Sequence, residues 1–364
     1  MRRRALMLGV ASLAGVPLLV RAAQPTLGVT LPLTGVQREV ARELELGYRM
    51  AAAEAGVGVV VMDDESIPDR VAANVKRLAA DPAVTALSGI VGTPHAQAGL
   101  AAAKKGGLPV VGIRSGAGFL RKGDPSVFHL RASYEDELDK MVSYCVGAGI
   151  KQLAIIYSED SFGTSSRDHL VSRLGSAGIT LVSNLGVERN GSNIPDVVQK
   201  TAAVARSDGL TAIALLLIVK PMTAAATELR VKHAVMQPIL AMSFTITQAV
   251  ATTTDRALAG LGIVSAFPLP RAGVESIQQR YRAALAREGR TGTLTESVTA
   301  YEGFFYGTVA SRAISAAAGN REAVGRVLRA GMSLGDLKVD FGSGMVGYHF
   351  LEFVHKSRDG LLRV

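Results

Sequence analysis

Residues 88–117, SGIVGTPHAQAGLAAAKKGGLPVVGIRSGA, decide how this chain folds. In this stretch an apolar run ends in a Gly-Thr-Pro loop, an alanine-rich helical segment follows, and a second apolar run at 108–113 ends in Arg-Ser-Gly. The alternation predicts two parallel strands joined by a helix, so both loops fall at the carboxyl ends of strands, where α/β sheets bind ligands. Their hydroxyls, backbone N–H groups and guanidinium suit a small anion or polar molecule and offer little to a reaction.

The same alternation continues along the chain and predicts an α/β fold with a doubly wound parallel sheet. Short apolar runs have the length of buried strands, at 27–31, 58–62, 86–91, 109–113, 153–157, 179–185, 211–218, 238–242 and 261–264. Segments with apolar residues at intervals of three and four lie between them, among them 69–80, 135–147 and 166–177. Near the end, residues 339–344 predict a turn into an alternating strand at 348–354.

A second α/β unit of similar order begins near residue 151, and the joint between the two units is expected at 131–134. Ser133 is a good N-cap residue, and Glu135, Asp136 and Glu137 would occupy the first turn of the next helix, where the helix dipole favours acidic groups. The chain of 364 residues is long enough for two domains.

The first 23 residues are predicted to be a signal peptide and not part of the fold. Three arginines precede an apolar run at 5–20, and small residues at Ala22 and Ala23 suit cleavage. A buried N-terminal helix is the alternative, whereas the run is shorter than the roughly 20 residues of a membrane span. No cysteine stands at the cleavage site to carry a lipid. We therefore expect export to the periplasm, with the general and twin-arginine routes both open.

Charge and cysteine content exclude several classes of function. Without the first 23 residues, 36 lysines and arginines face 31 acids, and the basic residues are scattered, so no nucleic-acid partner is expected. Cys145 is the only cysteine, so the chain has no internal disulfide, and its helical context predicts an inert, buried thiol.

Catalytic and metal-binding motifs are not found in the setting that their chemistry needs. The six histidines lack metal-ligand spacing. A Gly-x-Ser-x-Gly string at 331–335 and a Gly-x-Gly-x-x-Gly string at 342–347 do occur, but neither stands between a predicted strand and a predicted helix. The acidic run from Asp63 to Glu65 is interpreted as the solvated end of a strand rather than as a metal or acid–base cluster. The sequence therefore predicts neither an enzyme nor a bound metal or cofactor.

The segment at 27–35, LGVTLPLTG, resembles the opening strand and loop of type I periplasmic solute-binding proteins of ABC importers, the class of the leucine/isoleucine/valine-binding proteins. The resemblance continues in order through VMDDE (61–65), residues 89–117, VFHLR (127–131), AIIYSEDSFG (154–163), SVTAYEG (297–303) and DF (340–341). It covers essentially the whole chain after residue 23.

The resemblance implies two Rossmann-like lobes joined by three crossover strands, with ligand held in the cleft by hinge closure. Lobe 1 would comprise residues 24–132 and 268–338, and lobe 2 residues 133–267 and 339–364. The crossovers would lie near 131–134, 265–270 and 337–341.

The resemblance also assigns ligand positions in lobe 1. Thr93 matches the position whose hydroxyl and neighbouring N–H groups receive a ligand carboxylate, and a plain cap on the following helix is the alternative. Arg114, Ser115 and Gly116 match the second ligand loop. There Gly116 replaces a threonine, Ser115 supplies a nearby hydroxyl, and Arg114 adds a guanidinium suited to a carboxylate. The alternatives for Arg114 are a surface position or a salt bridge between lobes.

Two neighbours of these loops receive weaker assignments. His95 either reaches the cleft or lies in a solvated loop. Arg131, in a crossover strand, is interpreted as structural, pairing with Glu135 or Asp136.

Three positions in lobe 2 complete the implied site. Phe162 matches an aromatic wall, with core packing as the alternative, and Val219 and Ser243 fall at two further ligand loops. Amino-acid binders carry an acid where Ser243 stands, so a buried ligand ammonium would lack its partner here.

The sequence thus predicts the monomeric solute-binding component of an ABC importer. It would capture a small carboxylate with an apolar or aromatic body and dock on an inner-membrane permease. A ligand-sensing module for a membrane receptor or kinase is the alternative, and a secreted α/β hydrolase is disfavoured because no nucleophile motif stands between a predicted strand and a predicted helix.

Overall fold

The computed structural model describes residues 24–189, 191–205, 210–271, 273–290, 292–342 and 345–364. The predicted signal peptide, with its cleavage site at Ala22 and Ala23, lies outside these residues. Among the helices of the described part, none is long and apolar enough to cross a membrane.

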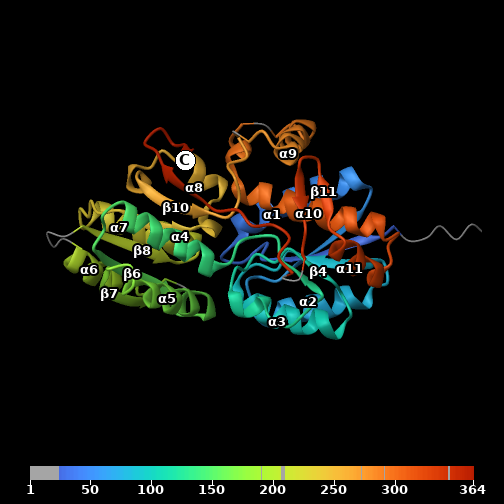
Figure 1. Ribbon diagram of the computed structural model, residues 1–364, viewed down its shortest axis with the longest axis horizontal. Helices are drawn as coiled ribbons and strands as arrows, with labels where there is room; N and C mark the ends of the chain where they lie inside the picture. The colour runs from blue at the N-terminus through green and yellow to red at the C-terminus, as the bar shows by residue number, and fades with distance from the viewer. Residues whose placement is uncertain (1–23, 190, 206–209, 272, 291, 343–344) are drawn as a thin grey trace, which may run out of the picture.

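Lobe 1, on the right of Figure 1, is built on a parallel sheet in the order β2-β1-β3-β4-β5. Its strands are β1 (Thr26–Leu31), β2 (Gly58–Asp63), β3 (Val84–Ser88), β4 (Val110–Val111) and β5 (Val127–Phe128). One face packs against α1 (Arg38–Ala55), α10 (Val298–Ala316) and α11 (Arg321–Arg329), with α9 (Ser276–Arg287) outside them. The other face packs against α2 (Pro68–Ala80) and α3 (Thr93–Lys105).

Lobe 2 is built on a sheet in the order β14-β13-β10-β9-β8-β6-β7. Five strands are parallel: β6 (Gln152–Ser158), β7 (Thr180–Val187), β8 (Thr211–Leu216), β9 (Ile239–Met242) and β10 (Leu261–Ser265). The antiparallel pair β13 (Glu352–Lys356) and β14 (Leu362–Arg363) extends it. Helices α4 (Tyr134–Gly147) and α5 (Ser161–Leu174) cover one face, and α6 (Ile194–Ala205), α7 (Val219–Val231) and the short α8 (Gln248–Thr252) lie on the other.

The two parallel sheets have the same strand order. In each lobe the second strand lies outside the first, and the third, fourth and fifth follow on its other side. The predicted doubly wound α/β fold is confirmed in both lobes. Such a sheet has a switch point beside its first strand, where the carboxyl ends open a crevice. Each lobe therefore has one such crevice.

Three neighbouring segments join the lobes at the centre of Figure 1, between β5 and α4, between β10 and α9, and between β12 (Leu337–Val339) and β13. The first and third segments bond to each other, since the His129 N–H donates to the Met345 carbonyl and the Gly347 N–H to the His129 carbonyl, both at 2.8 Å. The second and third touch where the rings of Phe267 and Tyr348 stack at 5.6 Å.

Some boundaries differ from the sequence prediction for local reasons. Helix α5 begins at Ser161 rather than 166, because the Asp160 carboxylate caps the N–H groups of Phe162 and Gly163 at 3.0 Å. A hairpin of β11 (Met332–Leu334) with β12 was not predicted, and the predicted strand at 348–354 begins only at Glu352. The predicted N-cap at Ser133 is confirmed, with Asp136 completing a capping box.

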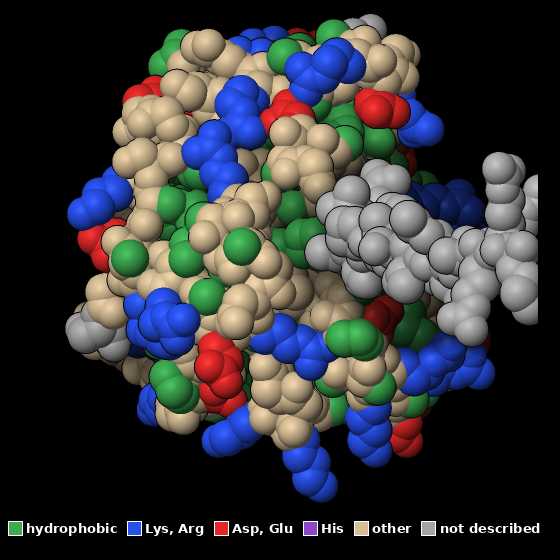
Figure 2. All heavy atoms as spheres, turned by 90° about the vertical axis from the view of Figure 1, so that its right-hand side faces the viewer, with side chains coloured by type: hydrophobic (Ala, Val, Ile, Leu, Met, Phe, Trp, Pro, Cys, Tyr) green, Lys and Arg blue, Asp and Glu red, His purple; other side chains and the backbone are tan. Residues whose placement is uncertain are grey.

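Figure 2 shows the end of lobe 1 that lies on the right of Figure 1. On this face lysine and arginine side chains are spread singly, with fewer acids between them and small groups of hydrophobic atoms. The scattering agrees with the distribution of basic residues along the sequence.

Helices α1 and α10 pack backbone to backbone through glycines. A Cβ atom on Gly303 of α10 would lie 2.5 Å from the Leu44 carbonyl oxygen, and one on Gly47 of α1 would lie 2.3 Å from the Phe304 nitrogen. Because α10 is buried along nearly its whole length, this close approach anchors the core of lobe 1.

We predict that Gly303→Ala destabilises the protein by about 1–3 kcal/mol, because the added methyl group overlaps backbone atoms that cannot move aside. Gly147→Ala is the matched control: Gly147 also lies in a helix, but its Cβ would meet nothing within 4 Å, so this change should be neutral or stabilise by up to about 1 kcal/mol. Urea unfolding of both variants measures the difference, and equal effects would contradict the packing argument.

Candidate functional site

The carboxyl ends of the two sheets face each other and enclose a small cavity, here called the inner cavity. Lobe 1 contributes Gln37, Val91, Gly92, Thr93, Pro94 and Arg114, and the lobe 2 side contributes Tyr134, Asp160, Phe162, Arg189, Ile218 and Phe244. The lobes are closed on each other: the Ser161 hydroxyl donates to the Gln97 side chain at 2.8 Å across the interface. The inner cavity holds about 20 Å³, enough for about one water molecule.

One end of the inner cavity is suited to an anion. Thr93 is the first residue of α3, and its hydroxyl lies 2.9 Å from that of Ser115, both buried. The N-cap residue is Gly92, with φ 98°, and no side chain caps the helix. The first N–H groups of α3 therefore lack a side-chain acceptor, and the helix dipole favours a negative charge there. Thr93 is thus not the plain cap that the sequence allowed as an alternative.

The opposite side of the inner cavity is aromatic. The rings of Tyr134, Phe162 and Phe244 meet edge to face, with centroids 4.7–5.9 Å apart. Gly116 makes room for this cluster, because a Cβ there would lie 2.6 Å from the Tyr134 ring. Its carbonyl also accepts the Tyr134 N–H at 2.8 Å. Such a surface suits a ring or hydrocarbon group.

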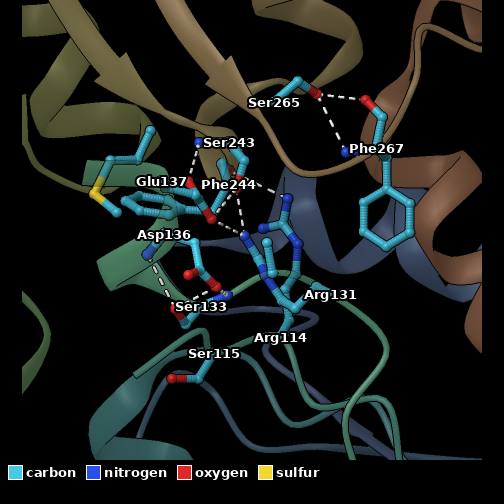
Figure 3. A network of polar contacts seen from close by, with 12 residues as sticks. Arg114, Ser115, Arg131, Ser133, Asp136, Glu137, Ser243, Phe244, Ser265 and Phe267 are labelled. Atoms are coloured by element: carbon cyan, nitrogen blue, oxygen red, sulfur yellow. Dashed lines mark hydrogen bonds and ion pairs between the residues drawn. The ribbon is translucent and has the colours of Figure 1, made fainter. Parts of the chain in front are cut away.

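A chain of buried charges also joins the two lobes, and Figure 3 shows Arg114, Arg131, Glu137 and Ser243 from it. Arg114 pairs with Glu302 of α10 at 2.8 Å, and Arg131 of the first crossover contacts the other oxygen of Glu302 at 3.3 Å. Arg131 also pairs with Glu137 of α4 at 2.7 Å, and the Ser243 hydroxyl donates to Glu137 at 2.9 Å. We call Arg114, Glu302, Arg131 and Glu137 the ion chain.

The ion chain is neutral as a whole and almost fully buried, with no side chain more than 3% exposed. Burial raises the pKa of a carboxyl group, but Arg114 and Arg131 together hold the pKa of Glu302 below its ordinary value. Arg114 also donates to the Phe244 carbonyl at 3.2 Å and to the Thr299 hydroxyl at 3.0 Å. Its guanidinium therefore links lobe 1 to lobe 2 and lines the inner cavity as well.

The residues predicted from the sequence are divided among these features. Thr93, Arg114 and Phe162 line the inner cavity, and Ser115 supports Thr93 from behind. Gly116 lies under Tyr134, Ser243 belongs to the surroundings of the ion chain, and Val219 lines a separate groove beside the cavity.

The predicted pairing of Arg131 with Glu135 or Asp136 is wrong. Asp136 accepts hydrogen bonds from Ser133 in the capping box, and Glu135 accepts the Gly118 N–H at 3.0 Å. Glu137 alone of the three acids faces inward, so it is the one that reaches Arg131.

The structure also bears on the sequence interpretations of His95, the acidic run and Cys145. His95 is 1% exposed, so it does not lie in a solvated loop. Within the acidic run Asp64 is buried and accepts the Thr30 hydroxyl at 3.1 Å, and burial raises its pKa to about 6. Asp63 and Glu65 are partly exposed at the end of β2, so the interpretation of the run as a solvated edge is wrong only for Asp64. Cys145 is a buried free thiol whose pKa burial raises to about 11. Within the described part of the chain, no group of three or more metal-ligating side chains occurs.

Sequence reasoning missed four polar or aromatic residues of the inner cavity: Gln37, Tyr134, Asp160 and Arg189. Each follows a predicted strand or lies in a crossover, which is the signal that was available. Asp160 accepts two backbone N–H groups and forms an ion pair with Arg189, so its carboxylate is fully engaged. The Gln37 side-chain nitrogen, in contrast, is buried without a partner.

A further contact between the lobes involves Glu43 of α1. Its carboxylate accepts the Gln248 N–H of lobe 2 at 3.0 and 3.1 Å, and the Ser297 hydroxyl also donates to it. Burial raises the pKa of Glu43 to about 7, although these bonds and Arg114 oppose the rise.

Comparisons with known proteins agree with this architecture. A family model of periplasmic binding proteins matches residues 24–344. A substrate-binding periplasmic protein from Ralstonia solanacearum has 24% identity and a TM-score of 0.81 over 93% of this chain and 99% of that one. None of the curated proteins compared matches significantly.

Two further solved structures share the fold at lower identity. A leucine-binding protein from Thermotoga maritima has 15% identity and a TM-score of 0.80, over 93% of this chain and 97% of that one. A solute-binding protein of an ABC transporter from R. palustris, solved with benzoate, has 13% identity and a TM-score of 0.80, over 93% and 95%.

We predict that Arg131→Met destabilises the protein by about 3–5 kcal/mol, because Glu137 and Glu302 would lose a buried counter-charge. The matched control is Arg49→Met, which removes the exposed pair with Glu45 at 2.6 Å and should cost under about 1 kcal/mol. Denaturant unfolding compares the two, and similar costs would argue against a stabilising role of the ion chain.

We also predict that the stabilising effect of Glu43 depends on pH. Because its folded pKa is about 7, above the ordinary value, the folded protein binds a proton more tightly than the unfolded chain between pH ~4.5 and ~7. The stability difference between the wild type and Glu43→Gln should therefore fall by about 3 kcal/mol across this window as pH rises. Urea unfolding at several pH values tests this, and a constant difference would contradict it.

Proposed function

The chain belongs to the periplasmic binding protein family, and from this premise we propose that it is the periplasmic solute-binding component of an ABC importer. It captures a small carboxylate with an aromatic or apolar body between its lobes and carries it to an inner-membrane permease. The observation that supports this ligand is the inner cavity, which places an anion site of lobe 1 opposite an aromatic cluster.

The anion end has three donors of different kinds. The Thr93 hydroxyl, which Ser115 supports from behind, the N-terminus of α3 without a side-chain cap, and the Arg114 guanidinium lie on one side of the cavity. A carboxylate accepts several such bonds at once, and charge-assisted bonds are the stronger ones. Because Glu302 already balances Arg114, the helix terminus supplies the charge preference for the ligand.

A ligand ammonium group has no comparable partner. Of the acids near the cavity, Asp160 is engaged by backbone N–H groups and Arg189, and Glu137 by Arg131 and Ser243. Burying an ammonium without an acceptor is costly. The site therefore favours a simple carboxylate, such as the benzoate bound by the R. palustris protein, over a free amino acid.

Binding proceeds through lobe closure without a chemical step. In this closed structure the inner cavity has room for about one water molecule, so the lobes separate to admit a ligand. On closing, Arg114 of lobe 1 bonds the Phe244 carbonyl and Ser161 of lobe 2 bonds Gln97. These contacts between lobes stabilise the closed form that a permease would recognise.

We predict by titration calorimetry that benzoate binds at least tenfold more tightly than leucine. Thr93→Val should raise the benzoate Kd about tenfold or more, because a bond to a charged acceptor contributes about 1.5–3 kcal/mol. Phe162→Ala should weaken benzoate as well, through lost ring contact.

Thr180→Val, an exposed change on β7 far from the cleft, is the control for Thr93→Val and should leave benzoate binding unchanged. Tighter binding of leucine than of benzoate would contradict the proposed preference for a simple carboxylate.

A further inference from the structure

Beside the inner cavity lies a larger space between the lobes, here called the outer groove. It holds about 610 Å³, which is within the ordinary range of ligand pockets. From lobe 1 it is lined by residues 34–40 and Glu65, and from lobe 2 by Ile218, Val219, Lys220, Thr223, Ala249, Val250, Thr253 and Leu258. Because both lobes contribute, closure shapes this groove together with the inner cavity.

The two spaces adjoin at Gln37 and Ile218, which line both of them. Gln37 precedes α1 in lobe 1, and Ile218 precedes α7 in lobe 2. The Gln37 side chain is 7% exposed, and its amide nitrogen has no hydrogen-bond partner. A buried donor without a partner costs about 1–3 kcal/mol. A ligand passing this point with an acceptor atom would satisfy it.

The floor of the outer groove is apolar. Val40, Val250 and Leu258 are buried beneath it, and Val36 stands exposed at its side. Four charged residues also line the groove, and none of them is buried: Arg38, Glu39, Glu65 and Lys220. Burial of a hydrocarbon chain on this floor would strengthen binding, whereas a second charged group would find no buried partner there.

We propose that the ligand is an extended carboxylate: its head lies in the inner cavity, and an apolar tail runs past Gln37 into the outer groove. The Gln37 amide donates a hydrogen bond to an acceptor atom at the root of the tail. This inference rests on the proposed function and deepens it. The outer groove is about thirty times larger than the inner cavity of the closed form, so the space for a tail lies in the groove.

The test uses calorimetry with benzoate, 4-pentylbenzoate and 4-butoxybenzoate, which share one head and differ in the tail. In the wild type both tailed acids should bind at least tenfold more tightly than benzoate, since each buried methylene contributes up to about fourfold. Ala249→Trp fills the outer groove without touching the inner cavity, so it should abolish this gain and leave benzoate binding unchanged. Ala101→Trp, an exposed site on α3 outside both spaces, should keep the gain.

The hydrogen bond from Gln37 is tested by the ratio of the Kd values of the two tailed acids. The contribution of their shared benzoate head cancels in this ratio. Wild-type protein should prefer 4-butoxybenzoate to 4-pentylbenzoate several-fold, because the ether oxygen accepts from Gln37, and Gln37→Leu should remove that preference. Unchanged benzoate binding in the Ala249→Trp variant shows that it is folded.

The outcomes separate this inference from the proposed function. If benzoate binds but the tails add nothing, or if the gain survives Ala249→Trp, the tail site is overturned and carboxylate capture stands. If Gln37→Leu leaves the ether preference unchanged, the role of Gln37 is overturned. If none of the three acids binds, carboxylate capture fails, and the tail site fails with it.

Discussion

The buried ion chain is the constraint on which the rest of the structure depends. Arg131 lies in the first crossover, and it contacts Glu302 of lobe 1 and Glu137 of lobe 2 at the same time. A buried charge must be paired, because the cost of desolvating it is large. The two lobes and the crossover must therefore meet in one arrangement when the protein is closed. The aromatic cluster and the anion end both take their positions from that arrangement.

The alternation of strands and helices was predictable because buried parallel strands leave a strong apolar pattern in the sequence. The positions of Thr93, Arg114 and Phe162 in the cavity also followed, since each stands just after a strand. The pairing of Arg131 did not follow from the sequence. Three acids stand in the first turn of α4, and which of them faces inward depends on the angle at which that helix packs, a tertiary property that no local pattern encodes.

Gln37 and Arg189 were missed for a related reason. Their places after predicted strands were the available signal, but glutamine and arginine at such places are usually solvated, so the signal alone does not mark them as buried or cleft-lining. Gln37 is only 7% exposed and lines both spaces between the lobes together with residues of lobe 2. Arg189 reaches the cavity because it pairs with Asp160, which itself serves as the cap of α5. Both placements arise from contacts between segments far apart in the chain.

In the function that we propose, the two sides of the inner cavity divide ligand recognition between the lobes. Lobe 1 holds the hydroxyls, the free helix terminus and Arg114, while Phe162 and Phe244 stand on lobe 2. An open form would therefore sort solutes in two stages, first by charge on one lobe and then by shape as the other lobe arrives. On this proposal, mutations in the loops of lobe 2 change which hydrocarbon body is accepted, while the preference for acids is kept. This separation gives the scaffold a route to new ligands that keeps its anion site intact.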